Sequence, residues 1–118
     1  MQREAEAFLW DIEHFGGRAV EWGTGLDEAA YDADELRRMA IERVLINVGE
    51  PLAQLAKFSP AVAQTLPDTR AVIGFRNVLV HGYSEVDTSK VIDILHKHLP
   101  KLIAHASGLR AELDAKAP

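Results

Sequence analysis

The segment from Arg76 to Tyr83 carries four side chains that together could act on a phosphate ester. It offers a guanidinium (Arg76), an amide (Asn77), an imidazole (His81) and a phenol (Tyr83) within eight residues. Arginine is the favoured donor to phosphate oxygens, because its planar fork makes two charge-assisted hydrogen bonds. Histidine titrates near neutral pH and can move a proton. This combination suits cleavage of an RNA phosphodiester, in which the ribose 2′-hydroxyl is the nucleophile and no metal is required.

The spacing within this segment places the four groups unevenly around a helix. Arg76 and His81 are five residues apart, so in an ideal helix their directions differ by about 140°. Asn77 and His81, four apart, share a face. A helix that ends near Gly82 would let His81 and Tyr83 turn toward a common cleft. The alternative interpretation is purely structural, since a histidine near a helix C-terminus is favoured by the helix dipole.

Helical periodicity dominates the rest of the chain, and no convincing strand pattern occurs. Helices are expected at about 3–22, from 32 or 34 past 55, at 68–80 and at 89–113. Long helices with short connections predict an all-α fold, an antiparallel up-and-down bundle of four to five helices, in a single domain spanning 1–118. Arg76 to His81 would then lie at the C-terminal end of the third long helix.

Glycine and proline residues mark expected irregularities in these helices. Gly16 and Gly17 should weaken the first helix by about 1 kcal/mol each relative to alanine. Pro51 should kink or interrupt the second helix, and Pro100 is a candidate bend in the last. Asp68 suits the positive end of the dipole of the third helix.

Composition excludes several classes of protein. The chain has 118 residues, of which 47% are hydrophobic and 26% charged, so a disordered chain is not expected. The absence of cysteine removes disulfides, thiolate metal sites and a cysteine nucleophile, and is consistent with a cytoplasmic location. The N-terminal segment is acidic and amphipathic rather than a signal peptide, and no stretch is long and apolar enough to predict a membrane span.

The charge is distributed unevenly along the chain. A net charge of −5 argues against a protein that coats nucleic acid nonspecifically. Residues 1–50 hold 5 Lys/Arg and 12 Asp/Glu, whereas residues 51–118 hold 8 Lys/Arg and 6 Asp/Glu. A surface that binds RNA is therefore expected in the second half.

Residues 74–83 resemble the Arg-x4-His-x-Tyr signature of HepT toxins, which belong to the HEPN ribonuclease superfamily. The resemblance extends to residues 40–45 and 48–50 upstream, and to 84–87 and 99–102 downstream, so that it covers about 32–104. One departure is Asp68, at a position that is often tryptophan in the family. The departure concerns local packing rather than the segment that carries the chemistry.

The resemblance implies a role for each residue of the segment. Arg76 and His81 match the catalytic pair of a metal-independent endoribonuclease, and Asn77 matches the polar residue that supports it. Two protomers would form a composite cleft in a homodimer that cleaves RNA without a cofactor. Tyr83 matches the tyrosine to which MntA, a minimal nucleotidyltransferase antitoxin, adds AMP. Such a modification adds bulk and negative charge beside a cleft that must accept phosphate.

Two other functions are compatible with the same residues. Arg76 and His81 could bind phosphate without cleaving it, in a non-catalytic subunit that presents nucleotide or substrate to a partner nucleotidyltransferase. A purely structural helical dimer would explain the folding pattern but not the clustering of the four polar groups.

The remaining polar residues are interpreted as structural. Glu42, Arg43 and Glu50 are expected to form exposed ion pairs, with support of the 76–81 helix as the alternative. His98 and His105 are about 10 Å apart along a helix, too far to share a metal ion. Trp10 and Trp22 are interpreted as core or interface aromatics.

Overall fold

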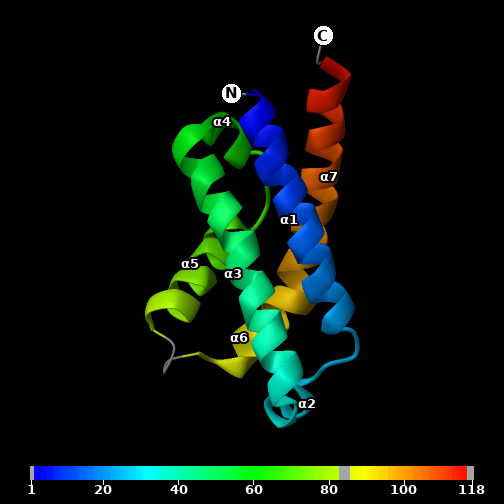
Figure 1. The fold of residues 1–118 in the computed structure, drawn as a ribbon, viewed down its shortest axis with the longest axis vertical. Coiled ribbons are helices and arrows are strands. Elements are labelled where there is room, and N and C mark those ends of the chain that lie inside the picture. Colours follow the sequence, from blue (N-terminus) through cyan, green and yellow to red (C-terminus); the bar gives the residue numbers. More distant parts are fainter. Residues whose placement is uncertain (1, 83–85, 117–118) are drawn as a thin grey trace.

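The computed structural model describes residues 2–82 and 86–116, and every regular element in these ranges is helical (Figure 1). Three long helices run side by side: α1 (Gln2–Trp22), α3 (Glu35–Phe58) and α7 (Leu99–Lys116). Helix α1 lies between α3 and α7, and α5 (Thr69–His81) packs against α3 on the side away from α7. The predicted all-α antiparallel bundle is confirmed.

The core lies where the three long helices face one another. A fully buried leucine or isoleucine contributes roughly 1.5–3 kcal/mol relative to an exposed one, and such residues line α1, α3 and α7. The largest fully buried side chains of the three long helices are Leu9, Ile12, Ile41, Leu45, Val48, Leu52, Leu55, Leu99 and Leu102. Helix α5 joins this core through Val72, Phe75 and Leu79, which leaves its opposite edge free to carry polar residues.

The two adjacent glycines of α1 have different environments. A Cβ atom at Gly16 would lie 2.9 Å from Cγ1 of Ile103, whereas one at Gly17 would meet nothing within 4 Å. Gly16 therefore allows α7 to approach α1 closely. It weakens helix α1, but it also makes this packing contact possible. Of these two glycines, only Gly17 weakens the helix without allowing a close packing contact.

Helix α3 begins and ends close to where the sequence predicts, but it is not interrupted at Pro51. The carboxylate of Asp34 accepts a hydrogen bond from the Arg37 amide at 3.0 Å, which caps the helix. Pro51 is buried inside α3, and the helix continues to Phe58, so the expectation of an interruption there is wrong. Two short helices, α2 (Glu28–Ala33) and α4 (Pro60–Ala63), flank α3.

The last predicted helix is divided by one wide turn. Asp87 caps α6 (Thr88–Asp93) through a 2.9 Å hydrogen bond from the Ser89 amide. The π-helical segment η2 (Ile94–His98) follows. Here the Leu99 amide donates to the carbonyl of Ile94, five residues earlier, rather than to the carbonyl of Leu95. A proline ring clashes with the carbonyl four residues before it. The wide turn lies immediately before Pro100, where this clash would otherwise arise.

Candidate active site

The guanidinium of Arg76 is held by oxygen atoms from two helices. Its Nη2 forms an ion pair with the Glu50 carboxylate of α3, and its Nη1 donates to Oδ1 of the adjacent Asn77 at 2.7 Å. The Nε atom is buried and has no hydrogen-bond partner within residues 2–82 and 86–116. The side chain is only 20% exposed. These contacts fix the plane and direction of the guanidinium before any substrate binds.

Gly49 allows this arrangement because it has no side chain. A Cβ atom at Gly49 would lie 2.3 Å from Cβ and 2.5 Å from Cγ of Arg76, closer than real carbon atoms approach. The backbones of α3 and α5 are therefore unusually close at this point. The neighbouring residue, Glu50, is brought within reach of the guanidinium by the same approach.

His81 is the last residue of α5. Gly82 caps the helix by donating its amide to the carbonyl of Val78 at 2.8 Å. His81 is exposed, and its imidazole forms no hydrogen bond or ion pair with another described residue. One helix thus holds Arg76 and Asn77 in contact and His81 near its end. Tyr83 lies outside the described residues.

The acidic residues of α3 do not behave as simple surface groups. Glu42 is buried, and its carboxylate accepts a hydrogen bond from the Tyr31 hydroxyl of α2 at 2.7 Å. The interpretation of Glu42 as an exposed residue is therefore wrong. Glu50 supports Arg76, which was the alternative for this group, while Arg43 is exposed. Gly49 is the site residue whose role the sequence pattern did not assign.

Exposed apolar side chains lie on α3 and α5, the two helices that hold the Arg76–Glu50 pair. Leu36 is 83% exposed and Met39 56% exposed on α3, and Val80 is 43% exposed on α5. Leu36, Met39 and Glu50 follow one another at helical spacing along one stripe of α3. Val80 lies one turn beyond Arg76 on α5. We call Leu36, Met39 and Val80 the apolar rim of the site.

The histidines of the second half have separate partners. The Nε2 atom of His96 lies 2.9 Å from the carbonyl oxygen of Leu26, and Nδ1 of His98 lies 3.1 Å from Oδ2 of Asp68. Across residues 2–82 and 86–116, no group of three or more histidine, aspartate or glutamate side chains is placed to hold a metal ion. Within the same ranges, no helix is sufficiently long and apolar to cross a membrane.

Comparison with known proteins places this geometry in a family. Residues 8–108 match the family described as Ribonuclease HepT-like. A protein of Methanocaldococcus jannaschii with the name "Putative RNase MJ1380" is 25% identical over 101 residues, which cover 86% of this chain and 92% of that protein. No significant match to a solved structure was found. The match over most of the chain shows that it belongs to the HepT-like ribonuclease family.

Proposed function

We propose that the chain is a metal-independent endoribonuclease that cleaves RNA with Arg76 and His81. The observation that carries the proposal is the arrangement of Arg76, whose guanidinium is fixed by Glu50 and Asn77 on the helix that ends in His81. A fixed guanidinium can stabilise the charge that develops on a pentacovalent phosphate without reorganising during the reaction. Membership of a ribonuclease family supports the same chemistry.

In the proposed reaction, His81 removes the proton of the ribose 2′-hydroxyl as the 2′-oxygen attacks the adjacent phosphorus. The bond from phosphorus to the 5′-oxygen breaks, and this oxygen takes up a proton as it leaves. The products are a 2′,3′-cyclic phosphate and a 5′-hydroxyl end. A positioned proton-transfer group contributes about 10²–10⁴-fold in rate. Arg76 binds the non-bridging oxygens through the guanidinium edge that Glu50 and Asn77 do not occupy.

The complete site requires a second copy of the chain. Arg76 and His81 differ in direction by about 140° on one helix, so one protomer does not present both groups to the same phosphate. The residues of the apolar rim, Leu36, Met39 and Val80, are exposed on α3 and α5, the two helices that hold the Arg76–Glu50 pair. A homodimer formed through this face would cover the rim and bring His81 of one protomer toward Arg76 of the other. The second His81 could then act as the general acid.

Cleavage of RNA in the presence of a chelator tests this function. The wild-type chain should cleave a labelled single-stranded RNA at the same rate with and without EDTA. His81→Ala and Arg76→Ala should each lower the rate at least 100-fold while retaining the helical circular-dichroism spectrum. His105→Ala is a matched control, because His105 contacts only the carbonyl of Lys101 within its own helix. A folded His81→Ala protein that cleaves at the wild-type rate would refute the assignment, and tight nucleotide binding without cleavage would support the non-catalytic subunit instead.

The proposal extends to control of this activity. The ribonuclease would act as a toxin, with Tyr83 as the residue that an MntA-like minimal nucleotidyltransferase modifies with AMP. Tyr83 follows His81 by two residues in the sequence, so an added phosphate would bring negative charge close to the RNA site. Co-expression with such a transferase should increase the intact mass by one or more AMP units and abolish cleavage. A Tyr83→Phe chain that still gains the mass would exclude this tyrosine.

A further inference from the structure

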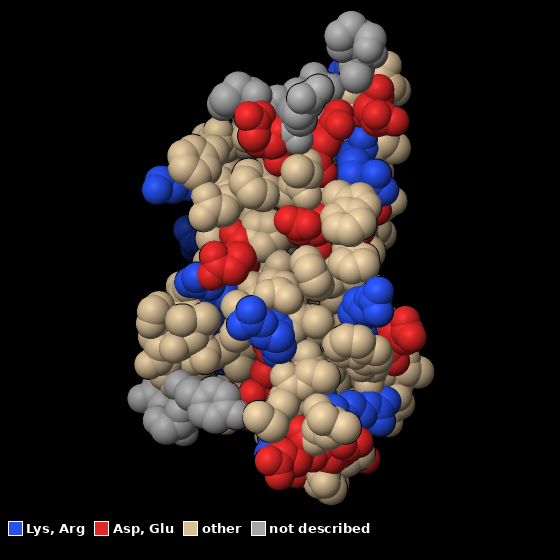
Figure 2. Space-filling view, in the orientation of Figure 1, with Lys and Arg blue, Asp and Glu red and all other residues tan. Residues whose placement is uncertain are grey.

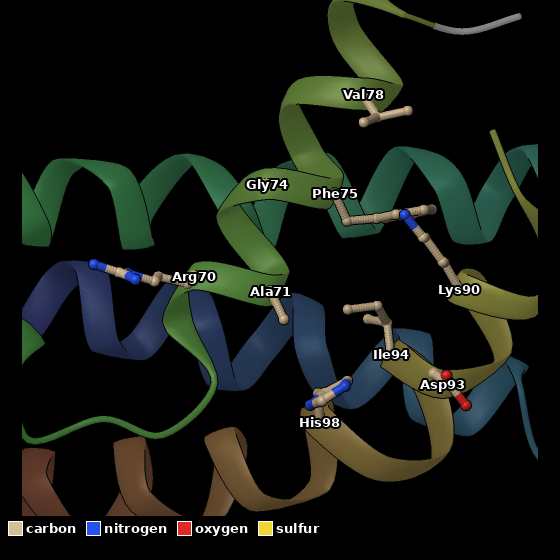
Figure 3. A pocket seen from close by; sticks show the side chains of 9 residues that line it. All are labelled: Arg70, Ala71, Gly74, Phe75, Val78, Lys90, Asp93, Ile94 and His98. Atoms are coloured by element: carbon tan, nitrogen blue, oxygen red, sulfur yellow. The ribbon is translucent and has the colours of Figure 1, made fainter. Parts of the chain in front are cut away.

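A pocket lies on the opposite side of α5 from Glu50, between α5 and the α6–η2 segment (Figure 3). Its volume is about 450 Å³, within the range of sites that bind small molecules. Helix α5 contributes one wall and α6 with η2 the other. The residues that define it are Arg70, Gly74, Phe75, Lys90, Ile94 and His98.

The walls of the pocket combine apolar side chains with one lysine at the edge. Phe75 and Ile94 are among the apolar residues, and the Lys90 side chain extends from α6 on the side of the pocket where Phe75 lies, whereas the Arg70 guanidinium points away from the other lining side chains (Figure 3). Neither Arg70 nor Lys90 forms an ion pair with another residue that the structure describes. The acidic lining residue, Asp93, pairs with Lys97 at 3.5 Å. The pocket therefore suits an anion that carries a flat apolar group.

His98 is held in place at the η2 wall. Its Nδ1 atom lies 3.1 Å from Oδ2 of Asp68, the residue that precedes α5, and Lys101 lies 3.7 Å from the same oxygen. Asp68 has a left-handed backbone with φ of 60°, a conformation that side chains other than asparagine and aspartate rarely adopt. His98 belongs to the π-helical turn, and such turns occur frequently at functional sites. The imidazole at the pocket wall is thus positioned by a specific, unusual contact.

The pocket and His81 lie along one edge of the same helix. Arg70, Gly74, Asn77 and His81 follow at intervals of four, three and four residues, so they form a single stripe of α5. Gly74 and His81 are about 10 Å apart along the helix axis. A single RNA strand that reaches His81 and follows this stripe would place a neighbouring nucleotide at the pocket.

We propose that this pocket is a subsite for a nucleoside phosphate, and that it receives a nucleotide adjacent to the scissile bond of bound RNA. The base packs against the apolar wall that includes Phe75 and Ile94, and the phosphate is bound by Lys90. This assignment rests on the proposed ribonuclease function for the origin of the ligand. The same chemistry would accept a free nucleoside monophosphate, so the test separates the two sources.

Gly74 offers a substitution that fills the pocket without disturbing its walls. A Cβ atom there would meet nothing within 4 Å, and Gly74→Leu also replaces glycine by a stronger helix former. Gly17→Leu on α1 is the matched control, because Gly17 is exposed, equally open and remote from the pocket lining. Both variants should therefore retain the wild-type fold and thermal stability.

Isothermal titration calorimetry with three probes tests the proposal: AMP, inorganic phosphate, and a 2′-O-methyl oligoribonucleotide that cannot be cleaved. We expect AMP to bind more tightly than phosphate. Gly74→Leu should weaken AMP binding at least tenfold, Gly17→Leu less than twofold, and Lys90→Ala about tenfold through loss of a charge-assisted contact. If the ligand is part of an RNA strand, Gly74→Leu weakens binding of the oligonucleotide as well. If it is a free nucleotide, only AMP binding changes, and the proposed RNA subsite is overturned.

Two further results would overturn the proposed subsite without testing the proposed ribonuclease function. Wild-type protein that binds neither AMP nor the oligonucleotide at millimolar concentration has no such site. AMP that binds equally to the wild type and to Gly74→Leu binds elsewhere. The cleavage assay is independent of both: wild-type protein that cleaves RNA but fails these binding tests keeps the proposed function and loses the subsite. Protein that binds AMP in the pocket but cleaves no RNA would keep the nucleotide pocket and lose the proposed ribonuclease function.

Discussion

Gly49 offers the sharpest single-residue test of how the Arg76 site is built. Gly49→Ala would place a methyl group 2.3 Å from Cβ of Arg76, so α3 and α5 must separate locally. Overpacking of this kind costs about 1–3 kcal/mol. We expect a corresponding fall in the free energy of unfolding measured by urea denaturation. The rate of RNA cleavage should fall by more than the loss of stability explains, because the separation of α3 and α5 pulls Glu50 away from the Arg76 guanidinium.

The matched control is Gly17→Ala in α1, where the new methyl group meets nothing within 4 Å. This change should raise the free energy of unfolding by about 0.5–1 kcal/mol, the ordinary gain from replacing a helical glycine. Equal stabilisation of both variants would contradict the close approach of the two helices at Gly49.

The buried carboxylate of Glu42 gives a second prediction at this scale. Tyr31→Phe removes the hydroxyl that donates to Glu42 at 2.7 Å and leaves the carboxylate without that donor. A buried acceptor that loses its partner costs about 1–3 kcal/mol. Urea denaturation should show this loss in the wild-type background and a smaller one in a Glu42→Gln background. Equal losses in the two backgrounds would mean that Tyr31 acts through packing alone.

Residue types led to the proposed chemistry of the site, but they did not predict its contacts. Arg76 and Asn77 are adjacent in the sequence, so their proximity follows from the helix alone. Glu50 lies 26 residues before Arg76, and helical periodicity does not specify how two helices are rotated against each other. The close approach at Gly49 sets that rotation, and a glycine in a helical pattern does not by itself reveal what it faces.

At the scale of elements, the helix boundaries that could be predicted are those marked by a capping side chain. Asp34 and Asp87 cap the helices that begin after them, as their residue type suggests. Helix α2 has six residues, too few to show a helical period. The amino-acid composition of η2 does not differ from that of an ordinary helix, so the sequence does not predict its wide turn. Asp68 lies at the N-terminal end of α5 as expected, and its side chain makes no cap hydrogen bond but contacts His98, which its residue type did not predict.

The contact between the start of α5 and the η2–α7 junction predicts a pH dependence. The hydrogen bond from His98, with smaller contributions from Lys101, holds the pKa of Asp68 below its usual value of 3.8. The folded state therefore favours the carboxylate. Its contribution to stability is complete above the unfolded pKa and is lost as the pH falls through the lower folded pKa. The window of loss lies below about pH 4.

Asp68→Asn isolates this contribution, because asparagine also tolerates the left-handed backbone at this position. The variant should be less stable than the wild type at pH 6 by no more than about 1 kcal/mol, since the pair is partly exposed. The difference should shrink at pH 3, as followed by urea denaturation at each pH. A difference that stays constant between the two pH values would show that the charge of Asp68 is not responsible.

At the scale of the whole molecule, the end that carries α2 is strongly acidic. Acidic side chains gather over α2, further acidic side chains lie at the opposite end, and the surface between them mixes both signs (Figure 2). The exposed acidic residues at the α2 end include Asp27, Glu28, Asp32, Asp34 and Glu35. RNA should be repelled from this end. The proposed route along α5 avoids it, and RNA binding should weaken with added salt.

The apolar rim gives the prediction that concerns assembly. Leu36→Glu together with Met39→Glu would place two charges on a face that the proposed dimer must cover. Size-exclusion chromatography with light scattering should show monomers where the wild type is dimeric, and cleavage should fall at least 100-fold. Trp10→Glu is the control, because Trp10 is 48% exposed on α1, outside the α3–α5 face. A monomeric variant that cleaves at the wild-type rate would show that one protomer holds a complete site.

The wide turn at residues 94–98 has a consequence for how the chain tolerates changes in length. A turn closed by a bond over five residues holds one residue more than an ordinary helical turn. The segment from 88 to 116 can thus be described as a regular helix that has received a single insertion. Removing one exposed residue such as Lys97 would leave both halves in phase with the core, but it would restore the ordinary winding in which the Pro100 ring meets the carbonyl four residues before it. Length variation among relatives should concentrate in this turn, with His98 as the residue whose position shifts.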